Sequence, residues 1–238
     1  MDNKKGFLYL IPTTLGDNEP MEVLPVLVKE VIEKLDYFIV ENEKSARKFI
    51  KRIAPGKSQP SLTLFSLDKY ADQLIVNTYL DICEKGLSVG LLSEAGVPAI
   101  ADPGAEIVKL AHQKNIRVIP LVGPSSIILA MMASGFNGQN FAFNGYLPIE
   151  ASERKEAIKN LEKLSKDKNQ SQIFIETPYR NEKLFVDLKS TLNPATKLCV
   201  ACDITLSTEY IKTLHTNDWK NEHPDLQKRP TIFIIHKE

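Results

Sequence analysis

Apolar and polar positions follow two periods along the first half of the chain. Continuous apolar runs predict buried strands at 7–11, 37–40, 62–65, 87–92 and 116–121. Apolar residues spaced three or four apart predict amphipathic helices at 21–35, 43–53, 68–85 and 104–114. Pro25 fits the first helix only within its first turn, and Asp68 is the expected N-cap of the third. Strands alternating with helices favour a mainly parallel sheet covered on both faces.

The second half has a different pattern. Helices are expected at 124–134, closed by Gly135, and at 151–167 and 180–192. Strands are expected at 140–146, 172–176, 196–203, 208–214 and 231–236, the last three with little helix between them. This predicts a mixed sheet with antiparallel members. The fold class is therefore α/β, with an N-terminal α/β domain at 1–121 and a C-terminal α/β domain at 122–238.

Composition indicates an ordinary soluble globular protein. The 238 residues are 43% hydrophobic and 25% charged, and 30 Lys and Arg balance 30 Asp and Glu. A polyanion would therefore have to be met by a local patch, because no global field attracts it. No apolar run reaches the length of about 18 residues that a membrane span requires, so we expect a cytoplasmic protein without membrane contact.

Several common chemistries are disfavoured by missing motifs. The segment after the first strand, 11–17, lacks the dinucleotide fingerprint, and no phosphate-binding G-x-x-x-x-G-K-[ST] occurs. No motif surrounds any of the four histidines, so hydrolysis is not suggested. Cys199 and Cys202 form a C-x-x-C, but residues three apart on a strand point to opposite faces. We interpret both as core thiols and expect no metal site.

Two loops rich in glycine and proline, 91–104 and 120–126, each leave a predicted strand and enter a helix. Small residues at strand ends let a ligand approach backbone N–H and C=O groups, and open α/β sheets bind ligands at these carboxyl ends. A tight strand-to-helix turn alone also explains each loop. Together the two loops predict a ligand cleft.

Five motifs then occur in order: I-P-T-x-L-G-D, S-E-A-G-V-P-x-x-x-D-P-G, P-L-V-G-P-S-S, F-N-G-Y-L-P and I-E-T-P-Y-R. This order resembles the tetrapyrrole methylase superfamily of S-adenosylmethionine-dependent methyltransferases. Within it, the pattern is similar to bacterial enzymes that methylate a cytidine ribose 2′-hydroxyl in small-subunit ribosomal RNA. The resemblance implies two α/β domains with a cofactor cleft between them, S-adenosylmethionine as cofactor, and a homodimer.

The resemblance also implies site residues. The cofactor contacts it implies are Leu15, Gly96, Ala99, Ser125, Ser126, Cys202 and Thr231. Ser125 and Ser126 open a predicted helix, whose free N–H groups can bind a carboxylate. A ribose hydroxyl needs a general base, and Glu41 and Glu176, each at the end of a predicted strand, are the candidate catalytic carboxylates.

An RNA acceptor would need basic and aromatic contacts. Five basic residues recur along the helix at 43–53, namely Lys44, Arg47, Lys48, Lys51 and Arg52. They could follow a phosphate backbone, although a solvated helix face is the commoner explanation. Tyr179 and Arg180 could stack on a base and pair with a phosphate. Lys44, Tyr179 and Arg180 are therefore the candidate substrate-binding residues.

The chain departs from the pattern of these ribosomal RNA methyltransferases at three places. Asn42 stands where relatives have Asp, Leu206 where they have Lys, and Arg229-Pro230 where they have Gly-Glu. Lys44 likewise replaces an Arg, and the two are not equivalent at a bidentate phosphate contact. Three functions stay open: methyl transfer to ribosomal RNA, methyl transfer to a small molecule or protein, and cofactor or RNA binding without catalysis.

Overall fold

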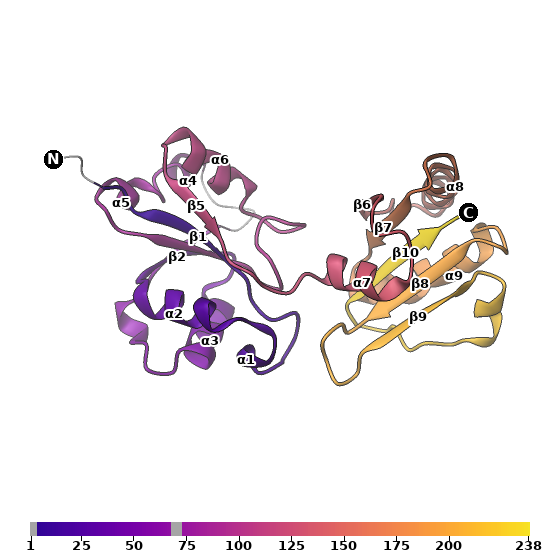
Figure 1. Ribbon diagram of the computed structural model, residues 1–238, viewed down its shortest axis with the longest axis horizontal. Helices are drawn as coiled ribbons and strands as arrows, with labels where there is room; N and C mark the ends of the chain where they lie inside the picture. Colours follow the sequence, from indigo (N-terminus) through magenta and orange to yellow (C-terminus); the bar gives the residue numbers. More distant parts are fainter. Residues whose placement is uncertain (1–3, 68–72) are drawn as a thin grey trace. The chain divides into compact units, whose positions relative to one another are not determined.

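Each half of the chain builds its own five-stranded sheet (Figure 1). The computed structural model describes residues 4–67 and 73–238. It divides into unit 1, Met1–Ser125, and unit 2, Ser126–Glu238. The division thus falls four residues after the expected domain boundary. Gly123 explains the shift, because a Cβ on it would lie 2.3 Å from the Pro12 side chain, so this turn packs against unit 1.

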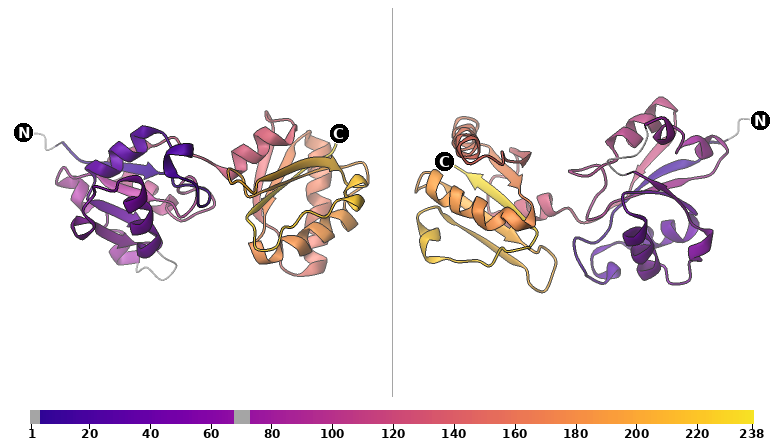
Figure 2. Two further views of the ribbon diagram at one scale, coloured as in Figure 1. Left: turned by 90° about the horizontal axis from the view of Figure 1, so that it is seen from below. Right: turned by 180° about the vertical axis from the view of Figure 1, so that it is seen from behind.

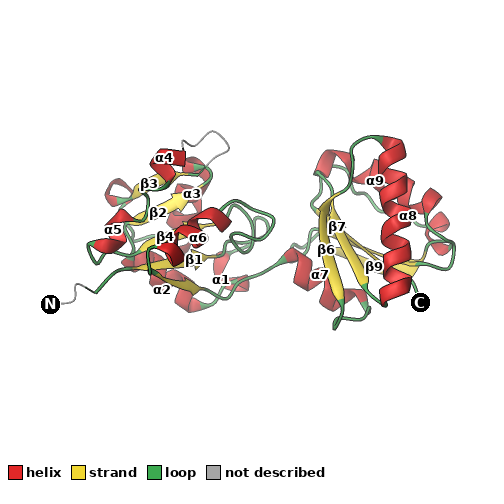
Figure 3. Ribbon diagram, turned by 90° about the horizontal axis from the view of Figure 1, so that it is seen from above, coloured by secondary structure: helices red, strands yellow, loops and turns green. Residues whose placement is uncertain are grey.

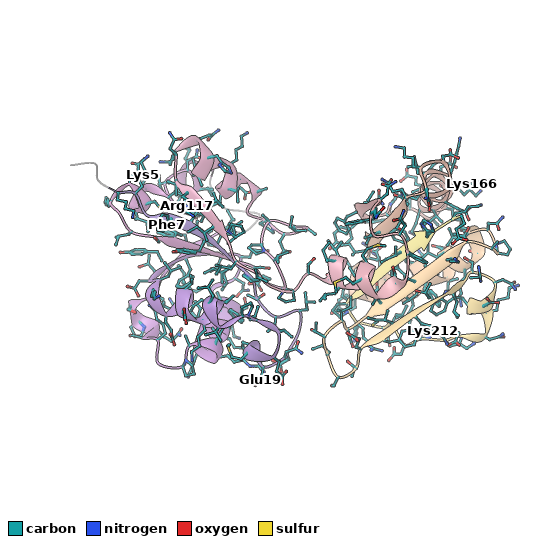
Figure 4. The ribbon with its side chains drawn as sticks, viewed as in Figure 1. Lys5, Phe7, Glu19, Arg117, Lys166 and Lys212 are labelled. Carbon is teal, nitrogen blue, oxygen red and sulfur yellow. The ribbon has the colours of Figure 1, made fainter. Side chains whose placement is uncertain are left out.

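The sheet of unit 1 is entirely parallel, as the continuous apolar runs predict. Its order is β3-β2-β4-β1-β5. The strands are β1 Phe7–Ile11, β2 Tyr37–Val40, β3 Thr63–Ser66, β4 Val89–Leu92 and β5 Arg117–Pro120. All five carboxyl ends therefore lie along one edge of the sheet. On the edge strand β5, the Arg117 guanidinium lies 5.9 Å from the ring centroid of Phe7 on β1 (Figure 4).

Helices cover both faces of this sheet. They are α1 Pro20–Val23, α2 Val26–Lys34, α3 Glu43–Ile53, α4 Gln73–Val76, α5 Asp81–Glu84 and α6 Ala105–Gln113, with a 3₁₀ turn η1 Gln59–Ser61. Phe38 of β2 packs with the buried residues of α2 and α3, whereas Ile39 packs with those of α5 and α6. Seen from behind, α6 and the pair α2 and α3 lie on opposite sides of the strands (Figure 2, right). Because successive side chains of a strand point to opposite faces, the strands contribute to two cores, one on each face of the sheet.

Two helix predictions in unit 1 were wrong. The helix expected at 21–35 is broken into α1 and α2 at Leu24 and Pro25, because a proline disfavours helical geometry in the preceding residue. The expected N-cap Asp68 lies outside the described residues. Within 73–85 the single long helix is replaced by the one-turn helices α4 and α5. Between them, the Thr78 hydroxyl donates to the Ile75 carbonyl at 2.7 Å, a local bond that competes with helix propagation.

The sheet of unit 2 is mixed, as predicted. Its order is β6-β7-β10-β8-β9; β6 and β7 are parallel and the other neighbours are antiparallel. The strands are β6 Phe141–Tyr146, β7 Ser171–Ile175, β8 Lys197–Cys202, β9 Tyr210–His215 and β10 Thr231–His236. All six residues of the central strand β10 are buried.

Three long helices complete unit 2: α7 Ser126–Ser134, α8 Ala151–Lys168 and α9 Asn181–Thr191. Unit 2 also has two 3₁₀ turns: η2 Pro178–Arg180 lies between β7 and α9, and η3 Asp218–Asn221 lies between β9 and β10. Figure 3 shows α7 on one side of the sheet and α8 and α9 on the other. The core under α8 and α9 includes Trp219, Phe174 and Phe233, all fully buried. Among the described residues, no helix has the length and apolar content that crossing a bilayer requires.

Candidate functional site

Three loops meet at the carboxyl edge of the unit 1 sheet. The Thr13 N–H, after β1, donates to the Gly96 carbonyl, after β4, at 2.9 Å. A Cβ on Gly96 would lie 2.9 Å from Leu15 Cδ2 and 3.0 Å from the Pro124 carbonyl oxygen, after β5. The structure therefore brings the predicted residues Leu15 and Gly96 into contact, beside the turn that leads to Ser125. Ser126 begins α7 and belongs to unit 2.

Gly96 has a structural reason to be glycine. Its φ is +74°, a left-handed conformation that disfavours a side chain. The space that a side chain would occupy is filled by Leu15 and Pro124. In the structure this glycine lets two other loops approach, and the approach of a ligand to its backbone stays a prediction. The three loops therefore pack together at Gly96.

An apolar pocket of about 390 Å³ opens beside this contact. It holds the predicted residue Ala99, with Pro98, Ile100 and Leu121 among its other lining residues. Ala99 has a φ of +65° and Ala101 a φ of +60°. Left-handed alanines are uncommon and concentrate where a loop shape is functionally required. The volume lies within the range of about 300–1,000 Å³ found for small-molecule sites.

A second, polar pocket of about 190 Å³ lies between the loop after β1, α3 and the loop after β4. Its polar lining residues include Thr13, Thr14, Ser45, Lys48 and Glu94. The 93–100 loop contributes residues to both pockets. S-adenosylmethionine combines an adenine ring with a charged amino-acid end. The residues present fit such a molecule, because one loop lines both an apolar pocket and a pocket that offers hydroxyls and charges.

Three carboxyl groups share this edge of the sheet: Glu41 after β2, and Glu94 and Asp102 after β4. Burial, and then the carboxyls of Asp102 and Glu94, raise the pKa of Glu41 from 4.5 to about 7. Burial also raises the pKa of Asp102, against the lowering effect of a 2.9 Å hydrogen bond donated by the Ser93 hydroxyl. The Ser45 hydroxyl lies 2.7 and 2.9 Å from the two Glu94 oxygens. Glu41 is thus a carboxylate that exchanges a proton near neutral pH.

The helix α3 gives Asn42 a structural role, and it shows which of the five basic residues are held in ion pairs. Asn42 is its N-cap, and its side-chain oxygen accepts from the N–H groups of Lys44 and Ser45 at 2.9 and 3.2 Å. An amide does this as well as a carboxylate does. Arg47 pairs with Glu43, and Arg52 pairs with Asp17 and Glu19. Of the five basic residues of α3, the exposed lysines 44, 48 and 51 form no ion pair with the residues that the structure describes.

Three other predicted residues lie in one row of the unit 2 sheet. Thr231 pairs with Cys202, which pairs with Tyr210. Glu176 directly follows Ile175, whose partner Ile232 is next to Thr231. Cys202 is fully buried, and this burial raises the pKa of its thiol. The sequence predicted these three residues separately, and the structure shows that they are neighbours at one end of the sheet.

Glu176 and Arg180 are held by each other. The Glu176 carboxylate accepts from an Arg180 guanidinium nitrogen and from the Thr177 N–H, both at 2.6 Å. The Glu176 side chain is only 2% exposed. Two residues for which the sequence predicted separate roles, in catalysis and in substrate binding, are thus joined in one ion pair, of which only the carboxylate is buried.

A neighbouring pair, Asp203 and Arg229, was missed as a functional unit. Arg229 Nε donates to the buried Asp203 carboxylate at 2.8 Å, and its terminal nitrogens donate to the carbonyls of Asp225 and Thr208. The Thr208 hydroxyl donates to the same carboxylate at 2.7 Å. Arg229 was noted only as a departure from the family pattern. Its partner lies 26 positions away and could not be read from either local segment.

Comparison with known proteins extends over nearly the whole chain. The ribosomal RNA small subunit methyltransferase I of Vibrio cholerae serotype O1 is 27% identical over 237 residues, covering 98% of this chain and 78% of the relative. The protein of that name from Buchnera aphidicola subsp. Schizaphis graminum is 29% identical over 236 residues, with coverages of 98% and 79%. No family model matches the chain.

Solved structures agree in fold. The methyltransferase CobJ superposes with a TM-score of 0.64 at 14% identity, covering 98% of this chain and 94% of its own. The uroporphyrin-III-C-methyltransferase of Thermus thermophilus gives 0.56 at 16% identity, with coverages of 98% and 95%. The chain therefore shares its fold with these methyltransferases.

The superfamily motifs have a common position in the structure. The first three follow β1, β4 and β5 of unit 1, and the last two overlap the ends of β6 and β7 of unit 2. Motifs at strand ends are expected where loops build a site on a rigid sheet. The resemblance and the fold therefore select the same loops.

Gly96→Ala should lower the stability of unit 1 by about 2 kcal/mol, because the new Cβ is strained at positive φ and contacts Leu15 and Pro124. Gly56→Ala is the control, since nothing lies within 4 Å of its Cβ position. Thermal unfolding by circular dichroism measures both variants. The chain's one tryptophan, Trp219, is buried in unit 2 and reports separately on that unit. Equal stability of the two variants would contradict the assignment.

Glu41→Gln should stabilise unit 1 at pH 8 by about 2 kcal/mol, allowing for partial exposure of the carboxyl to water. A raised pKa means that the folded protein binds the proton more tightly than the unfolded chain does. Stability is therefore lost as the pH rises from 4.5 to about 7. The gain at pH 5 should be less than half of that at pH 8. Denaturant unfolding at both pH values measures it, with the exposed Glu106→Gln as control.

Arg229→Ala should lower the stability of unit 2 by about 3 kcal/mol, because the Asp203 carboxylate, with a side chain 9% exposed, loses its ionic partner. Urea unfolding followed by Trp219 fluorescence measures the loss. Adding Asp203→Asn should recover part of it, since the unpaired buried charge is removed. Additive effects of the two substitutions would show that the pair is not coupled.

Proposed function

We propose that this chain is an S-adenosylmethionine-dependent methyltransferase that methylates a ribose 2′-hydroxyl of small-subunit ribosomal RNA. The observation that carries the proposal is the similarity, over 98% of the chain, to proteins named ribosomal RNA small subunit methyltransferase I. The exposed lysines 44, 48 and 51 support an RNA acceptor, because they form a stripe on α3 opposite its buried face.

The cofactor would be held by residues at two sets of strand ends. In unit 1 these are Leu15, Gly96, Ala99 and Ser125, and in unit 2 they are Ser126, Cys202 and Thr231. Bound S-adenosylmethionine supplies a methyl group on a positively charged sulfur, ready for in-line displacement. The protein's contribution is to align the acceptor oxygen and to exclude water.

Glu41 is the general base that its raised pKa and partial exposure favour. A ribose hydroxyl must lose its proton as its oxygen attacks, and a base works best when its pKa lies near the working pH. The pKa of Glu41 is raised to about 7 and its side chain is partly exposed, whereas the Glu176 carboxylate is buried against Arg180. We therefore assign proton transfer to Glu41 and an anchoring role to Glu176.

A small-molecule acceptor is the second candidate. It is favoured by the fold, which the chain shares with a uroporphyrin-III-C-methyltransferase and with CobJ. The substitutions at Asn42, Leu206 and Arg229 also separate the chain from the pattern of the ribosomal RNA methyltransferases. A homodimer in the cytoplasm completes the leading proposal, supported by the resemblance and by the ribosomal substrate of the named relatives.

Small ribosomal subunits that lack the modification, incubated with the protein and methyl-labelled S-adenosylmethionine, should acquire label on a ribose. Nucleoside analysis after complete digestion identifies the product. Glu41→Gln should lower kcat by about 10²–10⁴-fold with little change in cofactor affinity. The wild-type rate should rise with pH and level off above about 7, because the ionised carboxylate is the active form.

The outcomes separate the candidates. Cofactor binding by calorimetry without transfer to the subunits would favour another acceptor or a non-catalytic role. Full activity in Glu41→Gln together with loss in Glu176→Gln would move the base to unit 2. Glu106→Gln, which neutralises an exposed carboxylate of unit 1, should keep the wild-type rate and pH profile.

A further inference from the structure

An exposed aromatic ring and a lysine lie together on unit 2. Tyr179, in η2, is 78% exposed, and Lys228 Nζ lies 5.9 Å from the centroid of its ring. Single exposed aromatic residues are common on protein surfaces, so exposure alone indicates no function. What distinguishes this pair is how firmly both backbones are held.

The backbone on each side of Tyr179 is anchored. The Pro178 carbonyl accepts from the Lys228 N–H at 3.1 Å, and the Arg180 N–H donates to the Thr177 carbonyl at 2.8 Å. Pro178 also has its φ restricted by its ring. The Arg180 guanidinium is tied to the buried carboxylate of Glu176 at 2.6 Å. The exposed ring therefore projects from a rigid turn.

The backbone at Lys228 is held as firmly as that at Tyr179. Lys228 has a φ of +59°, a left-handed conformation that is uncommon for a residue with a side chain. The next residue, Arg229, fixes the segment through Asp203, and the Arg229 carbonyl accepts from the Asn181 side chain at 2.6 Å. Strain of this kind is kept where the position of a side chain matters.

We propose that Tyr179 and Lys228 form a platform for one unpaired nucleotide of the RNA acceptor. The base stacks on the Tyr179 ring, and the Lys228 ammonium contacts the adjacent phosphate. Proteins bind single-stranded RNA by this combination, since every base has a face to stack and every nucleotide carries a phosphate. The proposal rests on the proposed function. In this arrangement Arg180 holds the turn through its ion pair with Glu176 and does not bind a phosphate.

Because the chain has no net charge, a single contact between Lys228 and a phosphate matters more for RNA affinity. Lys and Arg balance Asp and Glu at 30 each, so attraction to RNA depends on local cations rather than on the whole molecule. On η2 itself, Arg180 is paired with Glu176, which leaves Lys228 as the cation that faces the ring.

The test is fluorescence anisotropy with a labelled single-stranded RNA of 12 nucleotides, at several salt concentrations. Tyr179→Ala should raise Kd about tenfold, whereas Tyr179→Phe, which keeps the ring, should bind within about twofold of wild type. Lys228→Ala should raise Kd about threefold and reduce the dependence of log Kd on log salt by about one phosphate contact. Cofactor affinity should be unchanged in all three.

Lys189→Ala is the matched control. Lys189 Nζ lies 4.5 Å from the ring centroid of Phe185, but that ring is only 5% exposed and cannot receive a base. The variant removes the same charge and the same kind of contact from unit 2, so its RNA affinity should stay close to wild type. An equal loss of affinity in Lys189→Ala and Lys228→Ala would overturn the specific role of Lys228.

The remaining outcomes are also decisive. Wild-type affinity in Tyr179→Ala overturns the platform while leaving the proposed function intact, provided that the wild type still methylates small subunits. Equally weak binding by Tyr179→Phe and Tyr179→Ala would overturn stacking as the cause. A wild type that does not bind the 12-nucleotide RNA but still methylates small subunits would overturn the platform alone, whereas failure to methylate small subunits would overturn the proposed function. Unfolding followed by Trp219 fluorescence confirms that each variant is folded.

Discussion

The contact of Gly96 with Leu15 and the Pro124 carbonyl fixes three loops of unit 1 together. Each loop leaves a different parallel strand, and each carries residues of the candidate cofactor site. Since the glycine has no side chain and a positive φ, the three backbones come closer than any other residue would allow. The apolar and polar pockets on either side of the 93–100 loop depend on this packing for their shape.

The two units treat buried carboxyl groups in opposite ways. In unit 2, Glu176 and Asp203 each lie against an arginine, and these ion pairs hold the chain in place. In unit 1, burial and then the neighbouring carboxyls of Asp102 and Glu94 raise the pKa of Glu41. A carboxylate paired with an arginine is suited to holding the chain, whereas a partly buried carboxyl beside other carboxyls is suited to exchanging a proton.

Periodicity predicted the central strands well because β4 and β10 are buried along their whole length. It failed at Pro25, where a restricted backbone outweighs apolar spacing, and within 73–85, where local hydroxyl bonding replaces a long helix. The resemblance selected residues at strand ends, which is where both units carry their loops. It could not show that Glu176 pairs with Arg180, or that Arg229 pairs with Asp203, since such contacts depend on folded geometry.

The position of β10 sets an order for the folding of the molecule. Every strand of the unit 1 sheet lies within residues 7–120, so that sheet can be completed early in synthesis. In unit 2, β10 is made after the other four strands and lies between β7 and β8 at the centre of the sheet. Until residues 231–236 have left the ribosome, β7 and β8 have no strand to join them. The candidate site residues of unit 2 are therefore assembled only after this segment has been made, whereas those of unit 1 can come together while unit 2 is still being made.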